Sequence, residues 1–587
     1  MNKFVTNRMK KTFQGLIVTL ACVGAGWGLC RGYASAQAAN GQSQAMSPFG
    51  IGGSNFRTRD KNFATWIPQM EAIGIHETRT LGGTGWVGKV PTNFATLDWQ
   101  WNYLTSHKMQ TGGDFYNYGS PYGLPMTRLG AWAKYVTAEV THFKGKIKYW
   151  EIWNEPPNGT AQGQTAADYA RFAVVTYNAA KRADPGCLIG LAAKSVDVAY
   201  LARAIKDGAK NHFNYITLHP YEVLGSAVIH DEDSVFMHIV PTVRKMLAAL
   251  DPSRENCPII FTELGCAAGG QWAPRIPGFT APEVQAYSVV EAYAMGIAEG
   301  VTCIDWFEGM DGDSGPMGLI AANGHPRPAY TAMAEMIKNL GQHPDYLGWV
   351  LLNNGKDYGF VFRGSQHTVM ITWAPLGMTN VVHFGQNVDV LDPLTGKVQH
   401  VNKYRLTSAP IMVIGVPLPQ LTQAATNKSM PFPWGGNYTN AKSVSVLFGK
   451  KIEQKGLHLC SLGTIKRQIV QYGGGVRFGN LPGGGTAFQV DENYLCYTPT
   501  PIMISAVVRR KNPNRPVSLN ILYESTASYA GADKRTRSKN IPAGNGWQTL
   551  HWRITNDEFV SCYGYNFILS SSGPYSIKSI TITKLTQ

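Results

Sequence analysis

The sequence of 587 residues lacks the short motifs of several common enzyme classes. None of its nine cysteines forms a C-x-x-C pair and no H-E-x-x-H occurs, so the chain shows no zinc-binding pattern. No G-x-G-x-x-G follows the first predicted strand, which argues against a dinucleotide site there. These absences leave chemistry carried by side chains alone, and we expect neither a metal nor an organic cofactor.

Acidic residues are scarce in the last part of the chain. Residues 421–587 contain 19 Lys and Arg but only 7 Asp and Glu, whereas residues 38–420 are close to electrically neutral. The net charge of +15 therefore resides mostly in the tail. A basic module joined to a near-neutral one suggests an anionic partner, either an acidic polysaccharide or a cell surface. A solvated positive surface without a partner would have the same composition.

Long apolar runs are missing except for one near the N-terminus, Gly15–Leu29. Basic residues precede it, among them Arg8 and Lys10, and small residues follow it in the segment GYASAQAAN. This order is typical of a cleaved export signal, which we place at residues 1–38. A retained membrane anchor is the alternative, but the run is shorter than the ~20 residues that a bilayer requires. We therefore expect a secreted or periplasmic protein without stable membrane insertion, in which an odd number of seven cysteines leaves at least one free thiol.

Short apolar runs alternate with amphipathic stretches from residue 47 to about residue 341, a pattern typical of parallel strands joined by helices. Eight such units over this length predict a (β/α)₈ TIM barrel. A doubly wound open sheet is the alternative. The predicted strands are 49–53, 76–83, 109–116, 147–155, 188–193, 215–221, 258–265 and 301–309.

The helical period disappears after the barrel. Residues 345–416 read as short strands separated by turn residues, a small β-sandwich pattern. The polar stretch 417–440 reads as a linker, and a second all-β segment follows it. The predicted fold is α/β, a TIM barrel followed by a β-sandwich and a further C-terminal all-β domain. The predicted parts are an export signal at 1–38, the barrel at 39–342, the sandwich at 343–419 and the C-terminal domain at 420–587.

In a TIM barrel the carboxyl ends of the strands form the active face. Glu155 ends the fourth predicted strand and Glu263 the seventh, so both carboxylates should face one cavity from opposite sides. Glycoside cleavage requires such a pair, because one group must protonate the leaving oxygen while the other meets the developing positive charge at the sugar carbon. The candidate residues at the strand ends are Arg79, Asp114, Asn154, Glu155, His219, Tyr221, Glu263, Trp306 and Glu308.

Two segments carry a family resemblance. EIWNEPPNG (151–159) and IIFTELG (259–265) resemble the acid/base and nucleophile strands of clan A glycoside hydrolases. The Trp-Asn-Glu-Pro form and the following β-sandwich are most similar to family 39, with families 5 and 51 as close alternatives. The resemblance covers residues 47–415 and leaves the tail unassigned, for which we expect a carbohydrate-binding type of β-domain.

The resemblance implies a role for each matching residue. Glu155 would be the general acid/base and Glu263 the nucleophile of a retaining double displacement. Asn154 would bond the sugar 2-hydroxyl. The remaining expected substrate contacts are Arg79 beside the nucleophile, Tyr221 hydrogen-bonded to it, His219 in or near the sugar site, Trp306 as an aromatic platform, and Asp114, Tyr116 and Glu308 as weaker contacts.

The predicted function is therefore that of a secreted, retaining glycoside hydrolase that cleaves β-glycosidic bonds of a polysaccharide or oligosaccharide. Two alternatives share these residues. One is a non-catalytic carbohydrate- or cell-surface-binding protein on a barrel scaffold, and the other is a transglycosylase, which differs only in how its site excludes water. In each case the expected partner is a carbohydrate, which could be an anionic polysaccharide, and not a nucleic acid.

Overall fold

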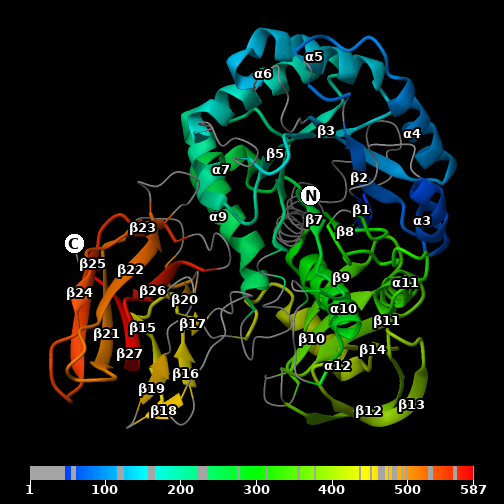
Figure 1. Ribbon diagram of the computed structural model, residues 1–587. Coiled ribbons are helices and arrows are strands. Elements are labelled where there is room, and N and C mark those ends of the chain that lie inside the picture. The colour runs from blue at the N-terminus through cyan, green and yellow to red at the C-terminus, as the bar shows by residue number, and fades with distance from the viewer. Residues whose placement is uncertain are drawn as a thin grey trace, which may run out of the picture. The chain divides into compact units, whose positions relative to one another are not determined.

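The computed structural model describes residues 46–585 apart from short segments (Figure 1). The predicted export signal, Tyr116 and three cysteines (Cys460, Cys496 and Cys562) lie outside the described residues. The segments outside the description are 1–45, 54–60, 83, 87, 116–124, 157–164, 222–223, 225–233, 271–272, 274–277, 313, 353–356, 376–377, 435–437, 450–451, 460–469, 473–474, 479–484, 492, 496–499, 526–532, 560–564 and 586–587.

Eight parallel strands close into a barrel, each paired with the next along the chain and β8 with β1 (Figure 1). They coincide with the eight apolar runs of the sequence, so the predicted TIM barrel is confirmed. Most of their residues whose burial is described are buried, because side chains fill the interior and helices cover the outside. The strands are β1 (Phe49–Gly52), β2 (Glu77–Gly82), β3 (Gln110–Phe115), β4 (Tyr149–Ile152), β5 (Leu188–Ala193), β6 (Tyr215–Leu218), β7 (Ile259–Leu264) and β8 (Cys303–Phe307).

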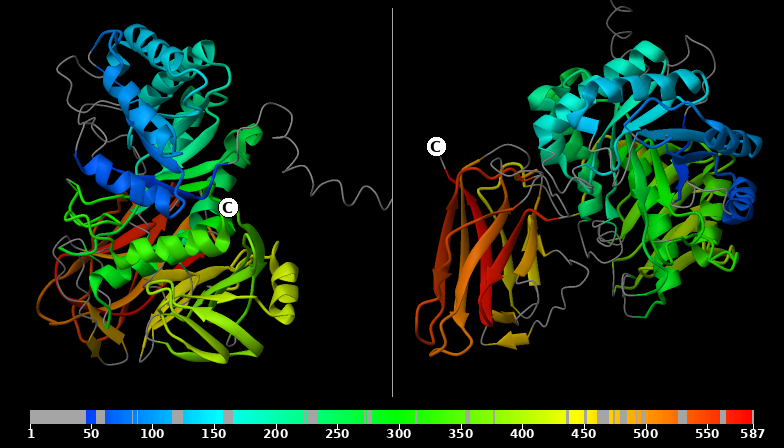
Figure 2. Two further views of the ribbon diagram at one scale, coloured as in Figure 1. Left: turned by 90° about the vertical axis from the view of Figure 1, so that its right-hand side faces the viewer. Right: turned by 45° about the horizontal axis from the view of Figure 1, so that its top comes forward.

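Helices follow the strands and surround the barrel (Figure 2). None of the helices in the described part of the chain is long and apolar enough to cross a bilayer. The α-helices are α3 (Lys61–Ala72), α4 (Ala95–Ser106), α5 (Leu129–His142), α6 (Ala166–Ala183), α7 (Val198–Ala204), α9 (Ile239–Leu250), α10 (Ala281–Glu299) and α11 (Pro328–Leu340). Shorter helical turns are η2 (Pro125–Thr127), η3 (Ile205–Ala209), η4 (Val235–His238) and η5 (Pro252–Arg254).

Two helices begin at capping boxes that fix the loops after β4 and β7. The Thr165 hydroxyl accepts the Asp168 amide at 3.1 Å, and the Asp168 carboxylate accepts the Thr165 amide at 3.3 Å, at the start of α6. Thr280 and Glu283 form the same arrangement before α10, which ends at Gly300 in the left-handed conformation (φ 86°). These caps fix the starts of the helices that follow β4 and β7, the strands at whose ends the two predicted catalytic glutamates lie.

Glycines on two strands leave room for large side chains inside the barrel. A Cβ at Gly190 would lie 2.5 Å from ring atoms of Tyr215 on the neighbouring strand. A Cβ at Gly50 would lie 2.2 Å from the Asp305 carboxylate. Tyr215 and Asp305 therefore occupy space that any larger residue at these glycines would take, and the interior is closely packed.

Glu77, the first residue of β2, is a buried carboxyl with little polar support. It is 5% exposed, and its Oε1 accepts the Ser47 amide at 3.1 Å. Burial raises the pKa of Glu77 to about 7. Because the folded state holds this proton to a higher pH than the unfolded state does, the contribution of Glu77 to stability is lost as the pH rises from about 4.5 to about 7.

Glu77→Gln should remove this pH dependence. Between pH 4.5 and pH 8 the free energy of unfolding of the wild type should fall by ~3 kcal/mol relative to the variant, because each pKa unit corresponds to about 1.4 kcal/mol. Urea unfolding of both proteins at pH 5 and pH 8 measures the difference. Glu255→Gln, at an exposed position, is the control and should show no such trend. A wild-type-to-variant difference at Glu77 that stays constant with pH would contradict this explanation.

Six antiparallel strands form the second domain, in the order β13-β12-β14-β11-β10-β9. Phe360 and Trp349 on one face join the hydrophobic core of the barrel. Val361 and Met370 on the other face belong to a second core. The part of the sheet that carries these residues is therefore buried on both faces, whereas many residues of the strands at 380–391 and 398–406 are exposed. The strands are β9 (Asp345–Trp349), β10 (Tyr358–Arg363), β11 (Thr368–Trp373), β12 (Asn380–Leu391), β13 (Val398–Leu406) and β14 (Ile411–Ile414).

The prediction that 417–440 is a linker is wrong, because part of this segment is helical. Residues Leu418–Asn427 form helix α12, whose Ala424 is fully buried. The Asn427 amide donates to the Trp349 carbonyl at 3.1 Å, which attaches the helix to β9. The residues that it buries are Ala424 and the polar Asn427, so the apolar spacing typical of an amphipathic helix is weak in the sequence. Trp434 also packs on this sheet, with its ring 4.9 Å from that of Tyr358, so the second domain continues past residue 430.

The C-terminal domain contains two sheets around a core of its own. Val446 and Ile504 of the first sheet share this core with Phe488 and Phe567 of the second, whose rings stack at 5.0 Å. The predicted C-terminal all-β domain is therefore confirmed. The first sheet contains β15 (Ser443–Phe448), β16 (Ile452–Lys455), β18 (Val470–Tyr472), β19 (Gly475–Phe478), β21 (Ile502–Arg510), β25 (Gln548–Ile554) and β27 (Tyr575–Lys584). The second contains β17 (Leu457–Leu459), β20 (Gly485–Val490), β22 (Ser518–Glu524), β23 (Asp533–Arg535), β24 (Lys539–Asn540) and β26 (Phe567–Ser571).

Four cysteines lie in the described part of the chain, and none of them forms a disulfide. They are Cys187, Cys257, Cys266 and Cys303. Burial raises the pKa of the Cys187 and Cys257 thiols to about 11, so both stay protonated and unreactive at neutral pH. The expected free thiol is therefore present, as a packing residue.

Candidate active site

Arg79 on β2 is the centre of the site. Its side chain is 12% exposed, and its guanidinium reaches residues from three other strand ends. It donates from Nε to Glu151 Oε2 at 2.7 Å, from Nη1 to Glu263 Oε1 at 2.5 Å, and from Nη2 to Asn154 Oδ1 at 2.6 Å and Asp114 Oδ2 at 3.2 Å. One buried cation therefore holds the ends of β2, β3, β4 and β7 in register.

His219 and Tyr221, which follow β6, contact the two predicted catalytic glutamates. His219 Nδ1 lies 2.9 Å from Glu155 Oε1 and 3.5 Å from Glu263 Oε2. The Tyr221 hydroxyl donates to Glu263 Oε2 at 2.9 Å, so Glu263 accepts on both oxygens, from Arg79 and from Tyr221. Carboxylate oxygens of Glu155 and Glu263 lie within 4.8 Å of each other. The structure therefore brings all of these predicted residues together.

Thr262 on β7 determines where His219 carries hydrogen. The Thr262 hydroxyl donates to Glu151 Oε1 at 3.2 Å, so its oxygen accepts from His219 Nε2 at 3.0 Å. Nε2 is therefore protonated, and the 2.9 Å contact between Nδ1 and Glu155 requires a second hydrogen. Burial lowers the pKa of His219, but the charge of Glu263 and the hydrogen bond to Glu155 outweigh it and raise the pKa overall. A proton is thus shared between the imidazole and Glu155.

The turn after β4 presents Asn154 and Glu155 through an uncommon backbone conformation. Trp153 and Glu155 have φ values of 67° and 51°, a region that residues with a Cβ rarely occupy. The Trp153 ring is 1% exposed, and its amide donates to the Phe115 carbonyl at 3.1 Å. Packing of this ring therefore offsets the cost of a turn that aims the two polar side chains at the site.

Asp114 belongs to the site, and one of its two carboxyl oxygens is left without a hydrogen-bond partner among the described residues. It is 6% exposed, and its Oδ1 has no hydrogen-bond partner among the described residues. Burial raises the pKa of Asp114 to about 8, although the nearby Arg79 opposes the shift. Asp114 therefore holds its proton to a higher pH than an exposed aspartate does.

Glu151 is a member of the site that the sequence analysis missed. It is 1% exposed and accepts hydrogen bonds from Arg79 and from the hydroxyls of Thr217 and Thr262. A signal existed in the sequence, because a glutamate in the middle of an apolar buried strand must have a charged or polar partner. Glu151 holds Arg79 in place and makes no direct contact with Glu155 or Glu263 among the described interactions.

Trp306 does not lie at the site, and the predicted aromatic platform there is wrong. Its side chain is 0% exposed and belongs to the hydrophobic core. Successive residues of β8 face opposite sides, so Trp306 points away from the interior that Asp305 occupies. Phe307 follows it and is only partly buried, with its ring 6.2 Å from that of Tyr221. Phe307 is therefore the aromatic residue of β8 nearest the site.

The predicted sugar contact at Glu308 is also wrong. Glu308 is 0% exposed, and its Oε1 accepts the Gly312 amide at 2.9 Å. Arg327 fixes the same loop through two hydrogen bonds of 2.6 Å to Asp311. Glu308 therefore shapes the loop after β8 and has no surface that a ligand could reach.

Three residues of the site could offer ligands to a metal ion. Glu155, His219 and Glu263 each have one suitable atom, and these atoms lie within 4.8 Å of one another. However, Arg79 Nη1 lies 2.5 Å from Glu263 Oε1, and this fixed positive charge would repel a second cation. The arrangement suits proton transfer and nucleophilic attack better than metal binding.

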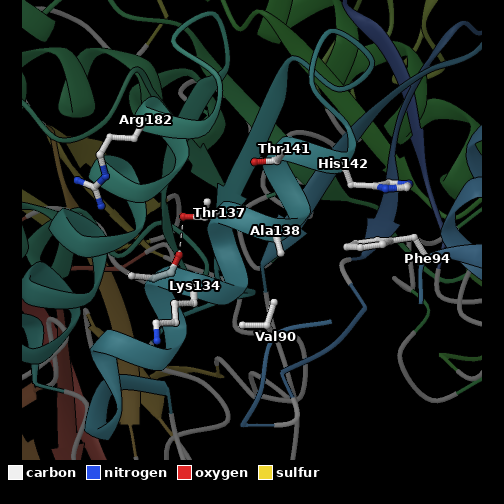
Figure 3. A pocket seen from close by; sticks show the side chains of 9 residues that line it. Val90, Phe94, Lys134, Thr137, Ala138, Thr141, His142 and Arg182 are labelled. Carbon is white, nitrogen blue, oxygen red and sulfur yellow. Dashed lines mark hydrogen bonds between the residues drawn. The ribbon is translucent and has the colours of Figure 1, made fainter. Parts of the chain in front are cut away.

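A hollow lies over α5, away from the strand ends (Figure 3). Its volume is about 630 Å³. Figure 3 shows the His142 and Phe94 rings lying parallel at its edge, with their centroids 4.0 Å apart. None of the strand-end residues lines this hollow, so it is separate from the site. Its lining residues are Val90, Phe94, Ala133, Lys134, Thr137, Ala138, Thr141, His142 and Arg182.

Sequence comparison gives no relatives: no protein-family model and no curated protein matches the chain. Structure comparison does find similar proteins. A family 30 endoxylanase from Clostridium papyrosolvens matches with 11% identity over 64% of this chain and 97% of its own, at a TM-score of 0.44.

A family 39 glycoside hydrolase from the gut symbiont Bacteroides cellulosilyticus WH2 is more similar. It matches with 16% identity over 63% of this chain and 81% of its own, at a TM-score of 0.51. The fold is therefore shared with a family 39 glycoside hydrolase, which confirms, at the level of the fold, the resemblance to clan A that the two glutamate motifs indicate.

Proposed function

We propose that this chain is a retaining glycoside hydrolase in which Glu155 and Glu263 perform a double displacement. The observation that carries the proposal is the approach of their carboxylate oxygens to within 4.8 Å at the ends of β4 and β7. Retaining enzymes hold the two carboxyl groups about 5–5.5 Å apart, whereas inverting enzymes separate them by roughly 6.5–9.5 Å to admit a water molecule. The observed distance favours direct attack by one of the two groups on the sugar.

The hydrogen bonds support a different role for each glutamate. Glu263 accepts hydrogen bonds from the Arg79 cation and from the Tyr221 hydroxyl, and these two donors orient its carboxylate as a nucleophile requires. Glu155 shares a proton with His219, so it can deliver that proton to the leaving oxygen and later take one from water. Both carboxylates are accessible, with side chains 21% (Glu155) and 16% (Glu263) exposed.

Two further residues are proposed to bind the sugar. Asn154 lies next to Glu155, and Arg79 orients its amide by a 2.6 Å hydrogen bond to Oδ1. We assign the Asn154 amide to the sugar 2-hydroxyl. The spare oxygen of Asp114 is the second candidate, because a buried polar atom without a partner gains most from a ligand hydroxyl.

The test is a substrate screen followed by product analysis. Purified protein lacking residues 1–38 is incubated with aryl β-glycosides and with neutral and anionic polysaccharides, and the first-formed anomer is read by NMR. A product with the configuration of the substrate is expected. An inverted product would refute the double displacement.

Phe307→Ala should weaken substrate binding. Stacking of an aromatic ring on a sugar contributes roughly 1 kcal/mol, so KM should rise about five- to tenfold with a smaller change in kcat. Trp306→Phe is the matched variant, because it alters a buried ring of the same strand; it should lower the melting temperature and leave KM unchanged. A rise in KM for Trp306→Phe and none for Phe307→Ala would overturn the assignment of the platform.

We also propose that the protein is exported after removal of its first ~38 residues, on the basis of the basic, apolar and small-residue order described above. Mass spectrometry of the protein recovered from the producing cell should show a mature N-terminus between residues 35 and 40. Recovery of an intact N-terminus from the membrane fraction would support the retained anchor instead.

A further inference from the structure

Three loops lie together at one end of the C-terminal domain. They join β21 to β22 (511–517), β24 to β25 (541–547) and β26 to β27 (572–574). The Ile541 amide donates to the Val517 carbonyl at 2.9 Å, and the Ser572 amide donates to the Ser518 carbonyl at 2.9 Å. The loops therefore form one continuous surface of the domain.

This surface is strongly positive. Lys511 and Arg515 are exposed on the first loop, and Arg537 and Lys539 are exposed on the chain that leads into the second. No aspartate or glutamate occurs in residues 501–523 or 534–556. Within the described part of the chain these four cations form no salt bridge. Their charges are therefore available to a partner.

Arginines at the end of β21 give the surface its shape. Arg510 donates from Nε to the Ile541 carbonyl at 2.8 Å and from Nη1 to the Pro513 carbonyl at 3.0 Å, which ties the first two loops together. The Arg509 guanidinium lies 4.7 Å from the centre of the Trp547 ring, and this ring is only partly buried. An aromatic plane thus lies beside the cations, held by a cation–π contact.

Protection of a sheet edge explains only part of this charge. Lys534, Arg535 and Lys539 lie on β23 and β24, which pair with β22 at the edge of the second sheet. Cations on an edge strand prevent pairing with other chains. Lys511, Arg515 and Trp547, however, lie on loops, where no edge needs protection.

We propose that this surface, defined as the basic end and made up of Arg509, Lys511, Arg515, Lys539 and Trp547, binds an anionic polysaccharide. Trp547 provides a plane on which one sugar ring can stack, and the surrounding cations pair with acidic groups along the chain. The choice of a glycan among polyanions rests on the proposed function of the barrel. The single aromatic residue also differs from the row of stacking platforms that single-stranded nucleic acids use.

The experiment measures binding directly, so it does not depend on turnover. Affinity of the mature chain carrying Glu263→Gln is measured by titration calorimetry for polygalacturonate and for its methyl ester, which keeps the backbone and removes the charge. We expect binding to the acid, at least tenfold weaker binding to the ester, and a steep decrease with added salt. Equal binding of both polymers would overturn the proposal.

Variants locate the site. Lys511→Gln, Arg515→Gln and Lys539→Gln together should lower affinity at least tenfold, and Trp547→Ala should lower it further. Lys442→Gln, Lys455→Gln and Arg553→Gln together remove the same charge from other exposed positions of the domain and should have little effect. Equal losses in the two triple variants would show diffuse attraction and refute a site at the basic end.

Two further measurements separate the remaining outcomes. Single-stranded DNA that binds more tightly than polygalacturonate, or displaces it, would assign the surface to nucleic acid and overturn the glycan proposal. Hydrolysis of a small aryl glycoside by the basic-end variants, with Glu263 restored, should be unchanged. If the barrel shows no glycosidase activity but the binding results hold, the proposed function fails and the basic end stands.

Discussion

Glu263→Gln should abolish turnover, lowering kcat/KM by about 10⁴-fold or more. Glutamine keeps the shape of the side chain and can still accept from Arg79, but it cannot form the glycosyl-enzyme ester. Substrate binding should persist, since Asn154 and Asp114 are untouched. The measurement is kcat and KM for an aryl β-glycoside, with binding followed separately by calorimetry.

Glu155→Gln should give a different pattern. Loss of the general acid costs roughly 10²–10⁴-fold for substrates with poor leaving groups, whereas an aryl glycoside that needs no proton should still form the intermediate rapidly. Added azide, which attacks without base assistance, should then restore release of the sugar as its azide. A pure binding protein would show no turnover before or after either substitution, and equal behaviour of the two variants would contradict the assigned roles.

Arg79→Met should be the most destabilising substitution at the site, costing about 3–5 kcal/mol of unfolding free energy. It leaves Glu151, which is 1% exposed, with only two hydroxyl partners and removes a donor from Glu263. Urea unfolding measures the loss. Arg171→Met is the control, because the Arg171 ion pair with Asp168 is on the surface and should contribute less than ~1 kcal/mol.

Adding Glu151→Gln to Arg79→Met should recover part of the lost stability, because the neutral amide removes the uncompensated buried charge. Catalysis should not recover, since Glu263 still lacks its cation. A loss below ~1 kcal/mol for Arg79→Met, or a double variant less stable than the single one, would show that Arg79 is not the structural centre of the site.

The barrel could be predicted from the sequence because each strand is a short apolar run between helical patterns. The carboxyl ends of the strands of a TIM barrel lie on one face, so residues at these positions could be assigned to one site. Arg79, His219 and Tyr221 could be placed by that rule alone.

The prediction for Trp306 was wrong for a different reason. Barrel strands are apolar on both faces, so the direction of each side chain is not visible from polarity. Asp305 was the available clue, since a buried aspartate must face the polar interior and its neighbour must face outward.

The other features that could not be predicted from the sequence depend on tertiary packing. Glu151 has a role only because Arg79, Thr217 and Thr262 arrive from three other strands. Helix α12 is held by packing of Ala424 and by the hydrogen bond from Asn427 to Trp349 on β9, and neither contact can be predicted from the local sequence. The basic end likewise depends on loops that are far apart in sequence.

The hydrogen bonds of the site form a continuous chain from Glu155 through His219, Thr262, Glu151 and Arg79 to Glu263. Protonation at any member therefore alters the electrostatic potential at all the others. Inflections in a pH–rate curve for this protein would be macroscopic constants of the whole assembly, not attributes of one carboxylate. A change in the pH optimum of this protein would therefore require paired substitutions among these residues, in which the second substitution balances the charge altered by the first.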